Sequence, residues 1–235
     1  MINQDNKFYI ISEKNGKQKL DLETYPSFLK TNSKTNISLD NIKKNVFFIT
    51  SAGEIYSLNY KSRNINWLFS LTAISNDQQI DLFYSSPLIN QNNEIILSSS
   101  LSTFSMNSIN GSLNWEIAIS SNILPILLNN NIIVTSRKGF VINMDRQTGK
   151  VLWSRNIFNK IKKLDYQNTG SVTSILFLSN SIFLTTEKGY FIFLDYQNGK
   201  IINFTKVAKA FFSKPVVIDG KIVVIDSKMR ILQFN

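Results

Sequence analysis

The sequence contains no cysteine and no histidine among its 235 residues. Without them the chain forms no disulfide bond, has no thiolate chemistry and has no imidazole general base. Cys/His zinc sites, Ser-His-Asp triads and Cys-His dyads are therefore excluded within this chain. We expect a protein without catalytic, cofactor-binding or metal-ligating residues, and one that needs no cofactor.

Long apolar runs and the features of a secretory signal are also lacking. The apolar stretch at 123–128 is far shorter than the roughly 18 residues that indicate a membrane helix. Residues 1–8 have no basic start, no apolar stretch and no small-residue cleavage site, and no lipid-attachment cysteine follows them. Taken literally, this sequence predicts a soluble chain that stays in the cytoplasm and carries no signal peptide.

The charge is strongly basic, with 26 Lys and Arg against 16 Asp and Glu, which gives a formal net charge of +10. Such a chain can be attracted to nucleic acid or to an anionic membrane surface, with an affinity that falls steeply with salt. The basic clusters at 43–44 and 160–163 are short, however, and lie between predicted strands. No platform of aromatic and basic residues accompanies them. We interpret the charge as lysines scattered over solvated turns, and expect no nucleic-acid partner.

The sequence does contain an internal repeat of four short strands joined by tight turns. Its clearest copy spans 125–153, and the final copy has a strong hairpin signal at Asp219-Gly220. Repeats of about 40 to 50 residues with four strands are typical of β-propeller blades. We expect an all-β fold, a single propeller domain over 1–235 with about five four-stranded antiparallel blades. The predicted blades lie at about 36–67, 85–115, 123–153 and 172–204, with partial blades at 1–21 and 213–235.

Glycine and aspartate recur in the turn before the fourth strand. Gly111, Gly149 and Gly199 supply left-handed backbone conformations without a Cβ clash. Asp145 and Asp195 can accept hydrogen bonds from backbone N–H groups of the turn that follows each of them. We assign these residues a structural role in preference to ligand binding.

Trp67, Trp115 and Trp153 each end a fourth strand, at separations of 48 and 38 residues. A flat indole could form the floor of a cofactor site. Its recurrence at one position of the repeat favours packing between neighbouring blades, because a single blade is too small to bury both of its faces alone.

The segment Met144-Asp145-Arg146-Gln147-Thr148-Gly149-Lys150-Val151-Leu152-Trp153 resembles the repeat of PQQ-like propellers. Partial matches at 194–200 and 11–17 extend the resemblance over nearly the whole chain, except for about 22–35. Propellers of the WD-repeat type match less well, because their Gly-His dipeptide is absent.

Two branches of that family bear on function. The quinoprotein dehydrogenases imply pyrroloquinoline quinone and Ca²⁺, held by carboxylates and amides, with a catalytic Asp and usually a vicinal cysteine pair. This chain has no cysteine and no recognisable ligand cluster. These absences make this branch the less favoured one. A quinone-dependent dehydrogenase-like or other ligand-binding propeller remains the alternative hypothesis for the function.

The other branch is the BamB-like family of outer-membrane assembly factors, which this chain is similar to in style. The resemblance implies an eight-bladed, non-catalytic scaffold for protein–protein interaction, whose partner is the β-barrel assembly machinery. It also implies a location at the periplasmic face of the outer membrane, reached only through a lipid anchor or a partner. None of that family's contact residues is carried over to a position of this sequence.

The two ends of the chain supply mismatched strands of the repeat. Residues 1–21 predict a third and a fourth strand, whereas 231–235 predict a third strand again. We expect four complete units and two partial ones, cut from the C-terminal part of a longer propeller whose missing part carries the secretion signal and lipid-attachment cysteine. A compact five-bladed ring is the alternative.

Overall fold

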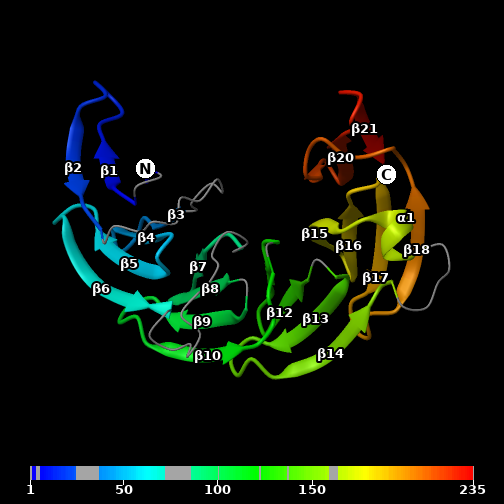
Figure 1. Cartoon of the computed structure of the whole chain (residues 1–235), viewed down its shortest axis with the longest axis horizontal. Coiled ribbons are helices and arrows are strands. Elements are labelled where there is room, and N and C mark those ends of the chain that lie inside the picture. Colours follow the sequence, from blue (N-terminus) through cyan, green and yellow to red (C-terminus); the bar gives the residue numbers. More distant parts are fainter. Residues whose placement is uncertain are drawn as a thin grey trace. The chain divides into compact units, whose positions relative to one another are not determined.

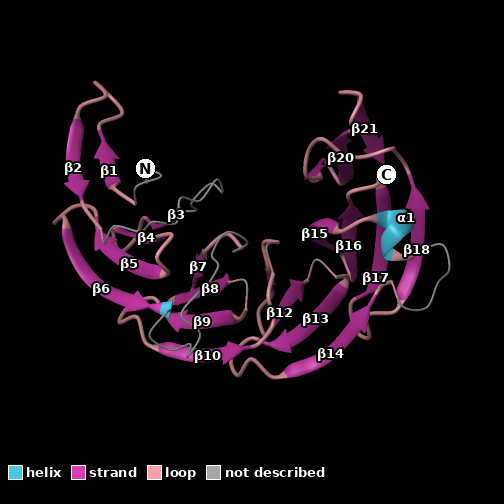
Figure 2. Ribbon diagram, in the orientation of Figure 1, coloured by secondary structure: helices cyan, strands magenta, loops and turns pink. Residues whose placement is uncertain are grey.

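The computed structural model describes residues 2–3, 6–24, 37–71, 86–99, 101–121, 123–136, 138–158 and 164–234. Figures 1 and 2 show that the regular secondary structure of these residues is almost entirely β-strand, and their one α-helix is α1, Tyr166–Thr169. The expectation of an all-β propeller fold with four-stranded antiparallel blades is confirmed. The chain divides into two compact units, 1–122 and 123–235.

The first unit consists of a two-stranded sheet followed by two four-stranded sheets. Its strands are β1 Phe8–Ile11, β2 Gln18–Leu22, β3 Ile37–Asp40, β4 Asn45–Ile49, β5 Glu54–Asn59, β6 Asn64–Ser70, β7 Ile89–Gln91, β8 Glu94–Ser98, β9 Thr103–Asn107 and β10 Leu113–Ile117. The sheet orders are β1-β2, β3-β4-β5-β6 and β10-β9-β8-β7, so strands adjacent in the sequence pair with each other. This up-and-down order is that of propeller blades.

The second unit consists of two four-stranded sheets followed by a three-stranded one. Its strands are β11 Ile126–Leu127, β12 Asn131–Thr135, β13 Phe140–Asp145, β14 Val151–Asn156, β15 Val172–Leu178, β16 Ser181–Thr186, β17 Tyr190–Asp195, β18 Ile201–Lys206, β19 Val216–Ile218, β20 Lys221–Ile225 and β21 Ile231–Phe234. The sheet orders are β11-β12-β13-β14, β15-β16-β17-β18 and β19-β20-β21.

The middle strands β4 and β16 carry runs of buried residues, because both faces of each strand are covered. In β4, Phe47 packs with Ile95 of β8, whereas the next residue, Phe48, packs with Phe8 of β1. The Phe8 and Phe48 rings are stacked, with centroids 4.4 Å apart. Since successive side chains of a strand point to opposite faces, a run of buried residues predicts a sheet between two neighbours.

The second unit repeats this arrangement around β16. Ile182 and Leu184 belong to one apolar cluster with Ile133 of β12. Phe183, which points to the opposite face, packs with Ile222 and Val224 of β20. The sheet β15-β16-β17-β18 therefore uses one face for the preceding sheet and the other face for the following one.

The hairpin predicted at Asp219-Gly220 is confirmed. Ile218 pairs with Lys221 across a two-residue loop, and both loop residues have positive φ angles, 51° for Asp219 and 74° for Gly220. Positive φ at both central residues is the requirement of a type I′ turn. This turn fixes the register of β19 against β20.

Candidate protein-binding site

Trp67 of β6 contacts the turn that precedes β10. Its Nε1–H donates a hydrogen bond to the Ser108 carbonyl at 3.1 Å. A Cβ built on Gly111, whose φ is 76°, would lie 2.7 Å from the indole ring. The indole therefore occupies the space that any side chain at Gly111 would need.

Trp153 of β14 makes the same pair of contacts with the turn that precedes β18. Its Nε1–H donates to the Tyr196 carbonyl at 3.1 Å, and a Cβ on Gly199 would lie 2.6 Å from the ring. Arg155 adds a hydrogen bond from Nε to the Asn198 carbonyl at 3.0 Å. One sheet is thus attached to the next through a tryptophan and a glycine.

The aspartates close these turns. Asp145 Oδ1 accepts from the Thr148 hydroxyl at 2.6 Å and from the Thr148 backbone N–H at 2.8 Å. The hydrogen bond from the Thr148 hydroxyl, and after it the bond from the Thr148 backbone N–H, lower the pKa of Asp145 below its ordinary value. Gly149, at φ 71°, donates its N–H to the Asp145 carbonyl. Asp195 Oδ1 accepts from the Asn198 N–H at 3.0 Å.

Trp115 lies in β10 and is 8% exposed. The structure places the eight repeat residues singled out in the sequence in strands and turns of the blades, but the three tryptophans lie within β6, β10 and β14 rather than at the ends of these strands, which continue two or three residues further. It brings Trp67 together with Gly111, and Trp153 together with Gly199.

Among the described residues of the second unit, the three-stranded sheet has one apolar face that no other sheet of that unit covers. Ile222, Val224 and Leu232 pack toward β16 and β17, so the alternate residues point to the other side. We call these alternate residues the open face: Val216, Ile218, Val223, Ile225 and Ile231.

Burial at one position of the repeat shows how unusual the open face is. Ile231 pairs with Ile225 in the register in which Val141 pairs with Thr135, and Phe191 with Thr185. Val141 and Phe191 are 0% and 2% exposed, whereas Ile231 is 73% exposed. Within the second unit, the sheet β19-β20-β21 therefore leaves uncovered a surface of the kind that the two preceding sheets bury.

The same sheet has a free edge at β21. In each four-stranded sheet the third strand pairs with a fourth, whereas β21, the third strand here, pairs on one side with β20 and has no second partner strand within the described residues. An edge strand presents unpaired N–H and C=O groups that can accept a strand from another molecule.

Comparisons with known proteins agree with this architecture. The family model described as outer membrane protein assembly factor BamB matches residues 1–155. The chain belongs to the BamB family. A crystal structure of BamB from Moraxella catarrhalis matches with a TM-score of 0.70 and 17% sequence identity, over 100% of this chain and 70% of that chain. At this identity the likeness shows the fold alone. No curated protein matches the sequence.

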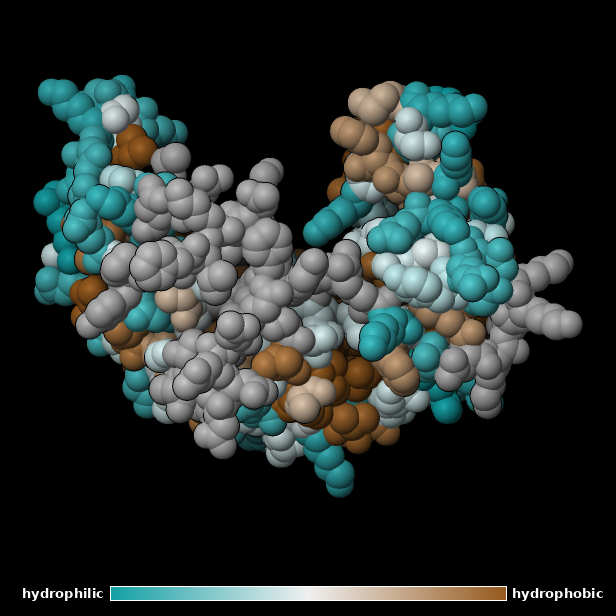
Figure 3. Space-filling model, in the orientation of Figure 1, coloured by the Kyte–Doolittle hydropathy of each residue, from teal (hydrophilic) through white to brown (hydrophobic). Residues whose placement is uncertain are grey.

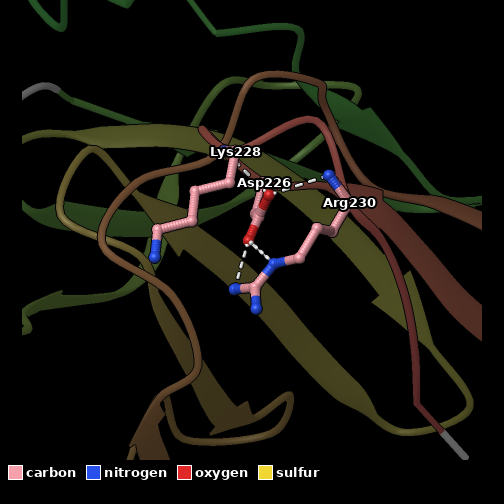
Figure 4. A network of polar contacts seen from close by, with 3 residues as sticks. All are labelled: Asp226, Lys228 and Arg230. Atoms are coloured by element: carbon pink, nitrogen blue, oxygen red, sulfur yellow. Dashed lines mark hydrogen bonds and ion pairs between the residues drawn. The ribbon is translucent and has the colours of Figure 1, made fainter.

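In this BamB-family chain, a charged pair anchors the β20–β21 turn (Figure 4). Asp226, 1% exposed, accepts from Arg230 Nη2 at 2.7 Å and Nε at 2.9 Å, and from the Arg230 backbone N–H at 2.9 Å. The backbone bond from Arg230 and then its side-chain bonds lower the pKa of Asp226. This pair holds the turn at which the exposed Met229 lies. In the sequence, the signal for this pair is the spacing of opposite charges at positions 226 and 230.

No cluster of three or more Asp or Glu that could hold a metal ion occurs in the part of the chain that the structure describes. Over the same residues, no helix is long and apolar enough to cross a membrane.

Proposed function

We propose that this chain is a non-catalytic propeller scaffold that binds protein partners during assembly of outer-membrane β-barrel proteins, at the periplasmic face of the outer membrane. The observation that carries the proposal is the match of the BamB family model to residues 1–155. The blade architecture of both units supports it, because propellers commonly serve as rigid platforms for other molecules. The partner expected from the family is the β-barrel assembly machinery.

The partner binds, in this proposal, as an extended strand at the edge of β21 with apolar side chains against the open face. Backbone hydrogen bonds along an edge supply affinity, and pockets for alternate side chains supply specificity. Ile231 and its cross-strand neighbour Ile225 form the centre of this site. In the preceding sheets the matching positions are covered by another β-sheet, so a β-strand is the occupant that this surface fits.

Binding of the purified chain to purified components of the assembly machinery tests the proposal. Ile231→Asp places a charge at the centre of the open face, and we expect it to weaken binding at least about fivefold, since removing a central apolar contact typically costs more than about 1 kcal/mol. Ile202→Asp is the matched control: Ile202 is also exposed, but it lies on β18, outside the open face. This control should bind like the wild type.

Three results would count against the proposal. One is the absence of binding to every component of the machinery. Another is an equal loss of affinity in Ile231→Asp and Ile202→Asp, which would remove the open face from the binding site. The third is a dimer, detected by light scattering, that Ile231→Asp dissociates; a second copy of the chain would then be the occupant.

A further inference from the structure

The net charge of the chain is confined to its second unit. Residues 1–122 contain ten Lys and Arg and ten Asp and Glu, whereas residues 123–235 contain sixteen Lys and Arg and six Asp and Glu. The first unit is thus formally neutral, and the second carries the whole charge of +10. The lysines are therefore not scattered evenly along the chain, and the excess positive charge lies on the second unit.

Three segments of the second unit are fastened together at one end of its sheets. The connector 207–215, which links β18 to β19, receives a hydrogen bond at the Ala210 carbonyl from the Ser227 N–H at 3.0 Å. On its other side, the Val207 N–H donates to the Gly189 carbonyl at 2.9 Å. The connector is therefore held between the β16–β17 turn and the β20–β21 turn.

These segments and their borders carry five exposed lysines, which we call the lysine cluster: Lys188, Lys206, Lys209, Lys214 and Lys228. No carboxylate of the described residues forms an ion pair with any of them. The Lys206 ammonium lies over the Tyr190 ring, 5.4 Å from its centroid, and the Lys188 ammonium donates to the uncharged Gln167 carbonyl. Both contacts leave the positive charge in place.

The acidic groups of these segments do not neutralise the cluster. Asp226 is occupied by Arg230, and Figure 4 shows the Lys228 side chain extending away from that carboxylate. Glu187 is the other acidic residue; its carboxylate, whose Oε2 accepts a hydrogen bond from the Ser171 N–H at 3.1 Å, offsets one of the five lysine charges. The cluster therefore keeps an excess of positive charge.

Two large apolar side chains stand exposed among the lysines. Phe212, 68% exposed, follows Lys209 in the connector, and Met229, 63% exposed, follows Lys228 in the turn. Figure 3 shows hydrophobic and hydrophilic atoms side by side over the region of β20 and β21. Exposed lysines around an aromatic and a flexible apolar side chain are the composition of surfaces that lie in a membrane interface.

We propose that the lysine cluster, together with Phe212 and Met229, binds an anionic phospholipid surface. Lysine is a strongly hydrated charge on a flexible stem, which suits a fluid array of phosphates, whereas ordered recognition of one carboxylate or phosphate favours the fork of arginine. The one arginine of these segments, Arg230, is committed to Asp226. This chemistry favours a lipid surface over an acidic protein, and it adds a direct contact to the anchor or partner expected from the family.

Sedimentation of the chain with vesicles tests this proposal. We expect binding to vesicles of equal parts phosphatidylcholine and phosphatidylglycerol, little binding to phosphatidylcholine alone, and loss of binding between ~0.1 M and ~1 M salt, where the Debye length shrinks from about 10 Å to about 3 Å. Neutralising four lysines should weaken binding about 100-fold or more, at about 1 kcal/mol per lysine near the surface. The variant combines Lys206→Gln, Lys209→Gln, Lys214→Gln and Lys228→Gln.

A control variant of the same net charge removes four exposed lysines of the first unit, and it should bind vesicles like the wild type: Lys14→Gln, Lys17→Gln, Lys19→Gln and Lys61→Gln. Phe212→Ser provides a second probe, because it should reduce the binding that persists as salt is raised. Equal binding to both vesicle types would overturn the proposal. So would equal losses in the two lysine variants, or cluster-dependent binding to polyglutamate but not to vesicles. None of the residues changed in these variants belongs to the open face, so the vesicle experiment tests lipid binding independently of the proposed binding of a protein partner.

Discussion

Gly199 and Trp153 form a pair in which the glycine leaves room for the ring: a Cβ on Gly199 would lie 2.6 Å from ring atom Cζ3. Real Cβ atoms do not approach other heavy atoms so closely, and Arg155 Cγ lies at the same distance from that position. Gly111 and Trp67 stand in the same relation in the first unit. In each unit, therefore, the turn glycine serves the contact between sheets as well as the turn itself.

Gly199→Ala should destabilise the chain much more than Gly220→Ala. Both glycines have positive φ, 68° and 74°, so both substitutions incur the left-handed strain of about 1–2 kcal/mol. A Cβ at Gly199 also meets Trp153, whereas nothing lies within 4 Å of a Cβ at Gly220. We expect the crowding to add about 1–3 kcal/mol to the loss of unfolding free energy, measured by urea denaturation. Equal losses in the two variants would contradict this contact.

Trp67→Phe tests the hydrogen bond of the same arrangement. Phenylalanine keeps an aromatic ring against Gly111 but removes the N–H that donates to the Ser108 carbonyl at 3.1 Å. We expect a loss of about 1 kcal/mol in the free energy of unfolding, the usual net contribution of such a bond plus a share for the smaller ring. Wild-type stability in Trp67→Phe would show that the bond contributes nothing.

Gly189→Ala should be more damaging than Gly170→Ala. A Cβ on Gly189 would lie 2.2 Å from the Ala208 carbonyl oxygen, which belongs to the backbone of the connector. A Cβ on Gly170 would lie 2.9 Å from both Cβ and Oε2 of Glu187, so its nearest neighbours are side-chain atoms at a longer distance than the backbone oxygen at Gly189. We expect Gly189→Ala to lose at least about 2 kcal/mol more than Gly170→Ala in urea denaturation, through backbone displacement. Hydrogen exchange should show the connector opened in Gly189→Ala and unchanged in Gly170→Ala.

The Asp226–Arg230 pair predicts a pH dependence of stability. Hydrogen bonds from Arg230 lower the pKa of Asp226 in the folded chain, so the pair contributes its full stability above the ordinary carboxyl value of about 3.9. That contribution is lost as the pH falls below this value and through the lowered folded pKa. Asp226→Asn should therefore lower the urea midpoint at pH 7, and its midpoint should fall less than that of the wild type as the pH drops below about 4. Parallel pH profiles would contradict the assignment.

Much of the fold can be predicted from local sequence patterns such as turns and apolar strands. The lysine cluster and the open face cannot be predicted in this way. The Asp219-Gly220 turn is predictable because positive φ at both positions has few residue choices. The short helix α1 was not expected, although Asp165 caps it through the Asn168 N–H and Gly170 follows it.

The lysine cluster could not be read from the sequence, because Lys188, Lys206 and Lys228 come together only through the fastened connector. The exposure of Ile231 could not be predicted from the sequence either, because Ile231 is as apolar as the buried Val141 and Phe191 at the matching positions. Burial depends on whether a neighbouring sheet is present, and no residue of the strand itself records that.

Site-specific crosslinking tests the central claim, that this BamB-family chain binds the β-barrel assembly machinery through β21. A photoreactive residue in place of Gln233 lies exposed on that edge strand, and one in place of Lys61 lies exposed in the turn between β5 and β6. With purified machinery, mass spectrometry should identify crosslinks from position 233 to a component of the machinery, and few from position 61. Equal yields at both positions, or none at position 233, would contradict the account.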